Sequence, residues 1–257
     1  MVGHTMDHIF NFGHFIPIST VDWYGRSTSV VFFRGCQFNC PYCQNHAYLE
    51  GRDDRTLEDM RTSIAKALPF ISALVFSGGE PTIQSSALME LARYAKSRSL
   101  DVGLETNGFA FDVIREMVGE GLLDKVFLDI KAPLDDPVLY AKVTGTDAKT
   151  GTQATMCAAR TLELCQDNDI DIEVRTTVFK GLVGAEQVLP IISYLDANTS
   201  NDLTYAIQQG IPENTRDLKD TESFCRDELL EMARAVVPKH SIHIRIRTKD
   251  TGDELIQ

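Results

Sequence analysis

The sequence predicts an α/β fold, specifically an incomplete (β/α)6 TIM-like barrel. Short apolar runs rich in β-branched residues alternate along the chain with segments whose apolar residues recur at helical spacing. This alternation implies a parallel sheet with right-handed crossovers, which either closes into a barrel or stays open as a doubly wound sheet. Six strand–helix units follow one another without a Gly/Ser-rich linker, so a single barrel is the simplest interpretation.

The expected strands begin with the run SVVFF, which is β-branched and aromatic and leads to a glycine, as a buried strand does. Together the expected strands are 29–33, 71–79, 100–108, 125–131, 170–179, 202–208 and 241–247. The first helix follows Thr56, its expected N-cap, and carries apolar residues at helical spacing. The expected helices are 56–68, 85–97, 111–120, segments within 136–166, 185–195 and 222–236.

The chain is expected to divide into three parts. Residues 1–27 are expected to be an irregular lead-in, residues 28–247 the barrel domain, and residues 248–257 a C-terminal tail. Three histidines of the lead-in resemble a metal-binding group, but histidines near a chain terminus more often bind nothing: His4, His8 and His14.

Composition excludes some classes of function. The 257 residues carry a net charge of -12, whereas nucleic-acid binders present basic surfaces, so nucleic acid is not expected as a partner. No run of about 18 apolar residues is present, and no membrane span is expected. The first residues do not have the pattern of a signal peptide. A cytoplasmic location is therefore expected, where clustered cysteines serve as metal ligands or catalysts.

The stretch RGCQFNCPYCQN contains three cysteines, Cys36, Cys40 and Cys43, in a C-x3-C-x2-C spacing. Thiolate sulfur is a soft ligand that suits an iron–sulfur cluster or zinc. A 4Fe-4S cluster held by only three cysteines keeps one iron open to another ligand, which is a reactive arrangement. We therefore expect these three cysteines to be metal ligands with a catalytic role.

Other interpretations of this stretch remain open. His46 could join the three cysteines in a Cys3His zinc site, and a disulfide or a purely electron-transferring cluster is also conceivable. The remaining cysteines, Cys157, Cys165 and Cys225, lack the short spacing of a second cluster. We expect each of them to be a small buried apolar residue.

Further candidate site residues stand where the expected strands end. In α/β barrels the functional groups gather at the carboxyl ends of the strands. Two of the candidate residues, Asp129 and Lys131, are two positions apart on one expected strand, so their side chains should point to the same side. Ile130 between them should pack on the other side. The whole set comprises Gly78, Gly79, Glu80, Glu105, Thr106, Asp129, Lys131 and Arg175.

The cysteine stretch resembles the signature of the radical S-adenosylmethionine (radical SAM) superfamily, in which an aromatic residue, here Tyr42, precedes the last cysteine. The SGGEP run that contains Gly78 and Gly79 resembles the GGE motif of the same superfamily. Residues around the cysteines are similar to the narrower pattern of glycyl-radical-enzyme activating proteins: Gly25, Arg26, Val30 to Phe33, Gly35 and Asn45.

The resemblance implies one 4Fe-4S cluster, bound by the three cysteines, and S-adenosylmethionine. It implies that the cluster reductively cleaves this cofactor to a 5'-deoxyadenosyl radical, which abstracts a glycine α-hydrogen from a partner enzyme. Arg175 would help to hold the cofactor, although a salt bridge explains this residue nearly as well. The other implied cofactor contacts are Tyr42, Gly78, Gly79, Glu80, Glu105, Thr106, Asp129 and Lys131.

The lead-in GHFIPISTVDWYGRSTSVVFF looks most like that of the activators of anaerobic ribonucleoside-triphosphate reductase. The resemblance therefore implies this glycyl radical enzyme as the partner, and a low-potential electron donor such as flavodoxin or ferredoxin. Glu105 stands where the family commonly has an aspartate, so a cation between it and Asp129 is in question. A small-molecule target stays open as an alternative, and the sequence after Ile211 is undiagnostic.

Overall fold

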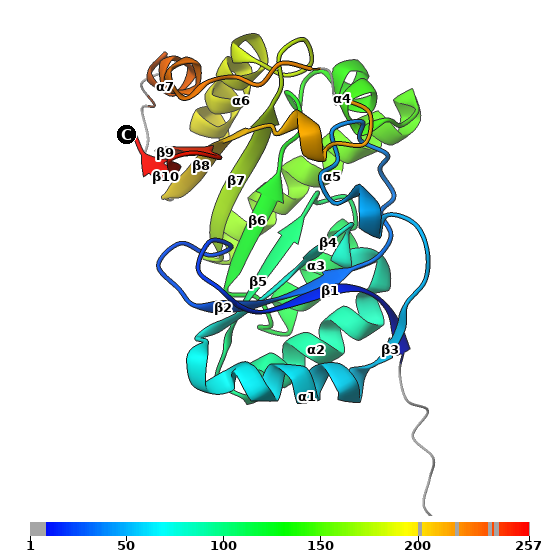
Figure 1. The fold of residues 1–257 in the computed structure, drawn as a ribbon. Helices are drawn as coiled ribbons and strands as arrows, with labels where there is room; N and C mark the ends of the chain where they lie inside the picture. The colour runs from blue at the N-terminus through cyan, green and yellow to red at the C-terminus, as the bar shows by residue number, and fades with distance from the viewer. Residues whose placement is uncertain (1–8, 200–201, 219–220, 236–237, 239–241, 257) are drawn as a thin grey trace, which may run out of the picture. The chain divides into compact units, whose positions relative to one another are not determined.

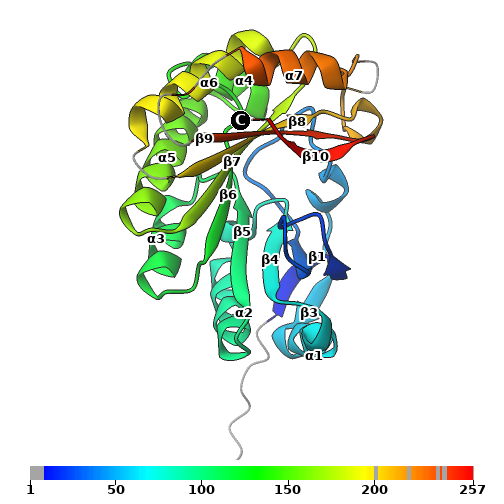
Figure 2. The same ribbon diagram turned by 90° about the vertical axis from the view of Figure 1, so that its left-hand side faces the viewer.

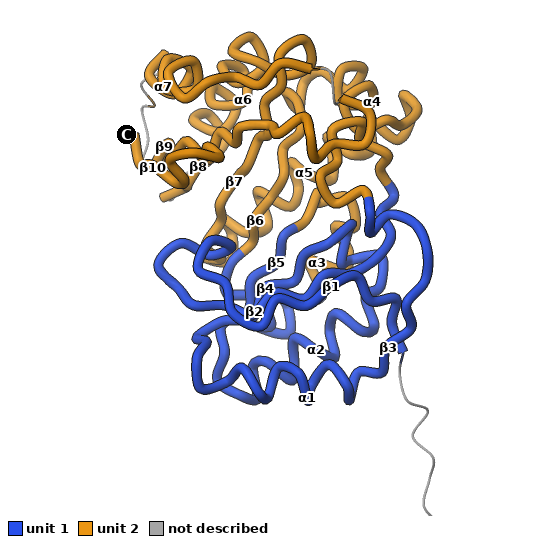
Figure 3. The backbone as a smooth tube through the Cα atoms, viewed as in Figure 1, with its two compact units in different colours: residues 1–37, 47–105, 116–125 blue, residues 38–46, 106–115, 126–257 orange. Residues whose placement is uncertain are grey.

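The computed structural model describes residues 9–199, 202–218, 221–235, 238 and 242–256. The chain forms two compact units, which Figure 3 distinguishes by colour. The first unit takes in residues 1–37, 47–105 and 116–125, and the second takes in residues 38–46, 106–115 and 126–257. No helix among the described residues is long and apolar enough to cross a membrane.

The first unit is built on strands in the order β3-β1-β2-β4-β5. β2, β4 and β5 run parallel to one another, whereas β1 is antiparallel to both β2 and β3. The strands are β1 (Ile9–Ser19), β2 (Thr28–Phe33), β3 (Asp54–Thr56), β4 (Ala73–Gly78) and β5 (Asp101–Thr106).

Two helices of this unit, α1 (Leu57–Ala67) and α2 (Ser85–Ser97), contact each other and lie side by side in Figure 1. Thr56 is the N-cap of α1, as predicted, because its hydroxyl accepts a hydrogen bond of 3.0 Å from the backbone N of Asp59. Short 3-10 helices lie at η1 (His46–Tyr48), η2 (Leu68–Phe70) and η3 (Pro81–Gln84).

The second unit has strands in the order β6-β7-β8-β9-β10. β7, β8 and β9 are parallel, and β10 is antiparallel to β9. The strands are β6 (Lys125–Asp129), β7 (Asp171–Val178), β8 (Leu203–Gln209), β9 (Ile242–Thr248) and β10 (Gly252–Leu255). The α-helices and the 3-10 helix that follow β5 are α3 (Phe111–Gly119), which belongs partly to each unit, α4 (Pro137–Thr144), α5 (Ala148–Asp167), α6 (Ala185–Asn198), η4 (Pro212–Asn214) and α7 (Arg226–Arg234).

Strand alternation gives the second unit an apolar layer beneath its helices. In β9, Ile242, Ile244 and Ile246 are buried, while the residues between them are charged or ionisable. α7 contacts β8 and β9, and α6 and α7 contact each other, as Figure 2 shows. The polar residues of β7 and β9 consequently share the opposite side of the strands, where the ion pairs described below lie.

The α/β class and the mostly parallel strands are confirmed. Every expected strand and helix is present, with ends that differ by a few residues. The last helix begins at Arg226 rather than near Glu222, because Cys225 is its N-cap and donates its backbone N–H to the side chain of Glu228 at 2.7 Å.

The expectation of an irregular lead-in was wrong for residues 9–19, because these residues form β1. Gly13, His14 and Pro17 interrupt the alternation of this segment, which is stabilised instead by pairing with β2 and β3. β3 and β10 were also missed, and β10 lies inside the expected tail. The division into lead-in, barrel domain and tail stays a prediction.

Candidate functional site

The cysteine loop leaves β2 through a firmly held base in the first unit. Gly35 donates its backbone N–H to the carbonyl of Tyr48 at 2.8 Å, which joins the two sides of the loop. The guanidinium of Arg34 donates to the carbonyls of Ala47 and Glu50 at 2.9 and 3.0 Å. Arg34 therefore fixes the chain that follows the loop against the strand that precedes it.

The Gly78-Gly79-Glu80 segment packs directly against this base. The backbone N–H of Glu80 donates to the carbonyl of Gly35 at 2.8 Å. A side chain at Gly79 would place its Cβ 2.0 Å from the same carbonyl oxygen, so only glycine permits the contact. The carboxylate of Glu80 is buried and accepts hydrogen bonds from the backbone N and hydroxyl of Thr82, and thereby caps η3. This segment is thus tied to the cysteine loop within one unit.

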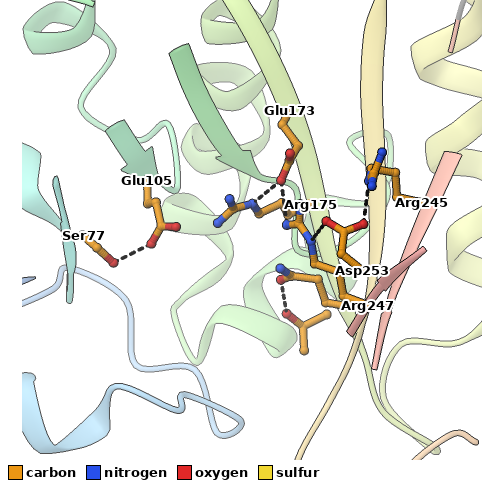
Figure 4. Close-up of polar contacts among 9 residues, drawn as sticks. Ser77, Glu105, Glu173, Arg175, Arg245, Arg247 and Asp253 are labelled. Carbon is orange, nitrogen blue, oxygen red and sulfur yellow. Dashed lines mark hydrogen bonds and ion pairs between the residues drawn. The ribbon is translucent and has the colours of Figure 1, made fainter. Parts of the chain in front are cut away.

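The residues at the end of β5 are engaged in local contacts. Glu105 accepts a hydrogen bond of 2.5 Å from the hydroxyl of Ser77, as Figure 4 shows. The hydroxyl of Thr106 accepts from the backbone N of Gly108 at 3.1 Å, which closes a turn. These contacts orient the side chains of Glu105 and Thr106, and their contact with a cofactor stays a prediction.

The other two cysteines of the loop belong to the second unit. Cys40 is buried, and the backbone N–H of Cys43 donates to its carbonyl at 3.2 Å. Burial raises the pKa of the Cys40 thiol to about 11, although the nearby ammonium of Lys131 opposes this rise. Burial also raises the pKa of Cys43, and Lys131 again acts in the opposite direction. The positive charge of Lys131 therefore already acts on two of the three thiols that would have to become thiolates.

Asp129 and Lys131 form an ion pair of 3.0 Å, so they do lie on the same side, and Ile130 between them is completely buried. Burial disfavours the charge of Lys131, but the neighbouring acidic groups, Asp129 foremost, together outweigh it, and the pKa of Lys131 lies well above its ordinary value. The Lys131 ammonium also stands 5.8 Å from the ring centroid of Tyr42. Lys131 thus remains charged near the cysteines.

Tyr42, the aromatic residue of the cysteine stretch, is buried among residues of the second unit. Its ring packs at 5.5 Å between centroids against Phe179 with an interplanar angle of 44°. This contact gives Tyr42 a packing role within the second unit. Its contact with a cofactor stays a prediction.

Arg175 belongs to a chain of ion pairs that the sequence did not reveal. Its Nε atom lies 2.7 Å from Glu173, which also accepts from Arg247 at 2.7 Å, and Asp253 joins Arg247 to Arg245. Figure 4 shows these five residues, which come from β7, β9 and β10. The guanidinium of Arg175 also stacks on Phe127 at 4.1 Å. The salt bridge considered for Arg175 is therefore present, and its role toward a cofactor stays a prediction.

The sequence after Ile211 gave no signal, yet part of it contacts the cysteine loop within the second unit. Arg216 donates from Nη2 to the carbonyl of Asn39 at 2.8 Å, and its Nη1 donates to the side chain of the same residue. The backbone N–H of Asp217 donates to the carbonyl of Pro41 at 2.9 Å. No sequence pattern could have indicated these contacts, because residues 39 and 216 are 177 positions apart.

Two of the three remaining cysteines are buried, as expected. Cys157 and Cys165 are buried, and burial raises the pKa of Cys165 to about 12. Cys225 is exposed, so the expectation of a buried residue was wrong, because the N-cap of α7 lies at the surface. His4 and His8 lie outside the described residues, and His14 stacks on Tyr48 in the first unit.

The donor set fits an iron–sulfur cluster better than a disulfide. Cys36, Cys40 and Cys43 lie on one loop and none of them forms a disulfide, and soft thiolates suit iron. One ring nitrogen of His46 is engaged at 3.1 Å with the carbonyl of Cys43. Over the described part of the chain, no three or more His, Cys, Asp or Glu side chains form a ready-made metal site. The ligand set therefore stays a prediction that rests on the loop.

Comparison with known proteins identifies the family. Residues 30–188 match the family model described as the radical SAM superfamily. A protein of Methanocaldococcus jannaschii named as a candidate glycyl-radical enzyme activating enzyme is 32% identical over 237 residues, which are 91% of this chain and 94% of that protein. The pyruvate formate-lyase-activating enzyme of Clostridium pasteurianum is 29% identical over 123 residues, which are 46% of this chain and 50% of that enzyme.

Solved structures agree at the level of the fold. A radical SAM methyltransferase from Sphaerobacter thermophilus superposes with a TM-score of 0.66 at 15% identity, covering 88% of this chain and 67% of that protein. The structure of TYW1 with a bound lysine-pyruvate adduct gives a TM-score of 0.63 at 17% identity, covering 92% and 82%. The chain therefore belongs to the radical SAM superfamily, and within it to the family of glycyl-radical enzyme activating enzymes.

Proposed function

We propose that this enzyme abstracts an α-hydrogen from a glycine of a partner glycyl radical enzyme, and that the partner is anaerobic ribonucleoside-triphosphate reductase. The observation that carries the proposal is the loop after β2 with its three cysteines, which is tied by hydrogen bonds to the Gly78-Gly79-Glu80 segment. The family supports a glycyl radical enzyme as the target. The choice of the reductase depends on the resemblance of the lead-in alone.

Cys36, Cys40 and Cys43 would hold three irons of a 4Fe-4S cluster and leave the fourth open for S-adenosylmethionine. When bound, the cluster supplies one electron to the sulfonium, which releases methionine and a 5'-deoxyadenosyl radical. Lys131 and Arg216 would offset part of the negative charge that the thiolates bring into this buried region. The chain would thus provide the soft ligands for such a cluster together with two cations whose charge acts on Cys43.

The cofactor contacts follow from the side chains that line the ends of the strands. The ammonium of Lys131, whose side chain is 14% exposed, would pair with the carboxylate of the methionine moiety, and Asp129, whose side chain is 41% exposed, would accept from the ribose hydroxyls. The backbone carbonyls at Gly78 and Gly79 would accept from the methionine ammonium. Tyr42, Glu80, Glu105, Thr106 and Arg175 complete the proposed set.

The proposed reaction consumes one electron from outside the protein, which is used in the cleavage of S-adenosylmethionine. The 5'-deoxyadenosyl radical would take a hydrogen atom from the glycine Cα and become 5'-deoxyadenosine, and the unpaired electron would stay on the glycine. The electron consumed in cleavage would come from a low-potential donor such as flavodoxin or ferredoxin. A cytoplasmic site of action is part of the same proposal.

The test begins with the enzyme alone. The protein would be reconstituted anaerobically with iron and sulfide, reduced with dithionite and incubated with S-adenosylmethionine, and 5'-deoxyadenosine would be measured. Cys40→Ala should lose both the cluster and the product, whereas Cys165→Ala, a buried thiol outside the loop, should retain both. A protein that holds zinc in place of iron and forms no product would refute the proposal.

The partner is tested separately by electron paramagnetic resonance. The reductase would be added to the complete reaction and examined for a glycyl radical, with pyruvate formate-lyase as the comparison. A radical on the reductase alone supports the proposed partner. If 5'-deoxyadenosine forms but neither protein carries a radical, the target is another glycyl radical enzyme or a small molecule.

A further inference from the structure

The chain that follows β8 returns to the cysteine loop and binds it on both sides of Cys40. We call residues 212–217 the return segment. Its Arg216 holds Asn39 through the carbonyl at 2.8 Å and through the side-chain amide, and its Asp217 holds the carbonyl of Pro41 at 2.9 Å. The return segment therefore fixes the backbone immediately before and after a predicted cluster ligand.

The return segment is itself anchored in the second unit. Thr215 is completely buried, and its hydroxyl donates to the carbonyl of Pro212 at 2.7 Å and accepts from the backbone N of Leu218 at 3.1 Å. Pro212 begins the 3-10 helix η4 and is buried as well. These contacts anchor the backbone on either side of Arg216 within the second unit, and the guanidinium reaches Asn39 from this anchored position.

The opposite side of Asn39 is fixed by the end of α4. The backbone N–H of Asn39 donates to the carbonyl of Thr144 at 2.9 Å. Gly145 has φ +63°, and a Cβ there would lie 2.2 Å from the carbonyl oxygen of Asn39. Asn39 is thus held between α4 and Arg216, which leaves the start of the Cys40–Cys43 turn little freedom.

Arg216 also places charge near a cluster ligand. Burial raises the pKa of the Cys43 thiol, while the positive charges of Lys131 and Arg216 act in the opposite direction. The side chain of Arg216 is 28% exposed and its Nε atom pairs with Asp217 at 2.6 Å, whose side chain is 53% exposed. One cation and one anion of the return segment thus lie close to the loop, with the cation turned toward it.

We propose that Arg216 is a positioning residue for the iron–sulfur cluster: its guanidinium holds Asn39, next to Cys40, and its positive charge favours the reduced cluster. The inference rests on the proposed function, because it requires that the thiols hold such a cluster. Reduction adds one negative charge to the cluster, and a nearby cation stabilises that charge. Loss of Arg216 should therefore make the cluster harder to reduce.

The experiment compares four full-length proteins after anaerobic reconstitution: wild type, Arg216→Gln, Arg216→Lys and Asp217→Asn. Iron and sulfide are counted, and the midpoint potential is measured by a redox titration that follows the spectrum of the reduced cluster. In Arg216→Gln the equilibrium constant for reduction of the cluster should be about tenfold lower than in wild type. For a one-electron reduction this shifts the midpoint potential by about 59 mV in the negative direction. Arg216→Lys should recover most of this loss, and Asp217→Asn should shift the potential the opposite way.

The outcomes separate this inference from the proposed function. A wild-type protein that binds no 4Fe-4S cluster would overturn both. Equal potentials in wild type and Arg216→Gln, with full cluster content, would overturn only the role of Arg216. If neither Arg216 variant retains the cluster, Asp217→Asn decides, because a positive shift supports the charge effect and an unchanged potential refutes it.

Discussion

The ion pairs of Glu173 should make a measurable contribution to stability, and Glu173→Gln tests it. Glu173 is 3% exposed and lies 2.7 Å from both Arg175 and Arg247. Burial alone would raise the pKa of Glu173, but these two guanidinium groups hold it at about 2, against an ordinary value of 4.5. A shift of about 2.5 units, at about 1.36 kcal/mol per unit, corresponds to about 3 kcal/mol of stability at pH 7.

The lowered pKa of Glu173 also determines how its contribution to stability depends on pH. Because the folded pKa of Glu173 is lower than the unfolded pKa, the contribution is present above pH 4.5 and is lost as the pH falls toward 2. The free energy of unfolding of wild type should therefore exceed that of Glu173→Gln by about 3 kcal/mol at pH 7. At pH 3 this difference should be smaller by about 2 kcal/mol. Urea unfolding followed by circular dichroism at the two pH values measures both differences.

The matched control is Glu163→Gln, which makes the same chemical change at an exposed position of α5 in the same unit. This variant should unfold within about 0.5 kcal/mol of wild type at both pH values. The reasoning is refuted if Glu173→Gln is as stable as wild type at pH 7. It is also refuted if a difference exists but stays constant down to pH 3, because the charge of Glu173 would then not be its cause.

Three further outcomes are expected. Lys131→Ala should bind S-adenosylmethionine at least about tenfold more weakly, about 1.4 kcal/mol, with iron content unchanged; equal affinity in a calorimetric titration would count against its proposed role. Gly79→Ala should lower the melting temperature and the cluster content, because its Cβ would lie 2.0 Å from the Gly35 carbonyl oxygen, whereas Gly119→Ala has open space and should not. In the metal-free protein at pH 8, iodoacetamide should label the exposed Cys225 before Cys165, whose pKa is raised to about 12 by burial, and mass spectrometry that shows the reverse order would contradict the burial of Cys165.

The parts of the fold that could be predicted are those whose pattern is local. The alternation of isoleucine with polar residues in β9 and the helical spacing after Thr56 both indicated the correct element. β1 could not be predicted in this way, because Gly13 and Pro17 break its alternation and its stability comes from pairing with β2 and β3. Tertiary pairing thus decided what local propensity could not.

In the candidate site, too, contacts between residues close in sequence could be predicted and contacts between distant residues could not. Asp129 and Lys131 are two residues apart, so alternation along a strand was enough to place them on one side. Arg247 and Glu173 are 74 positions apart, and Arg216 and Asn39 are 177 apart. No periodicity or motif relates such residues, and a single sequence contains no record of their contact. Only the folded chain shows that they meet.

β3 and β10 are the first and last strands in the order of paired strands, and this has a consequence for the protein in a concentrated solution. β3 and β10 are three and four residues long, and both carry charged residues in ion pairs, Asp54 with Arg52 and Asp253 with Arg245. Short, charged edge strands give another chain little backbone with which to pair. Removal of residues 249–257 would leave β9, with its three isoleucines, as the edge, and such a truncated chain should aggregate during expression.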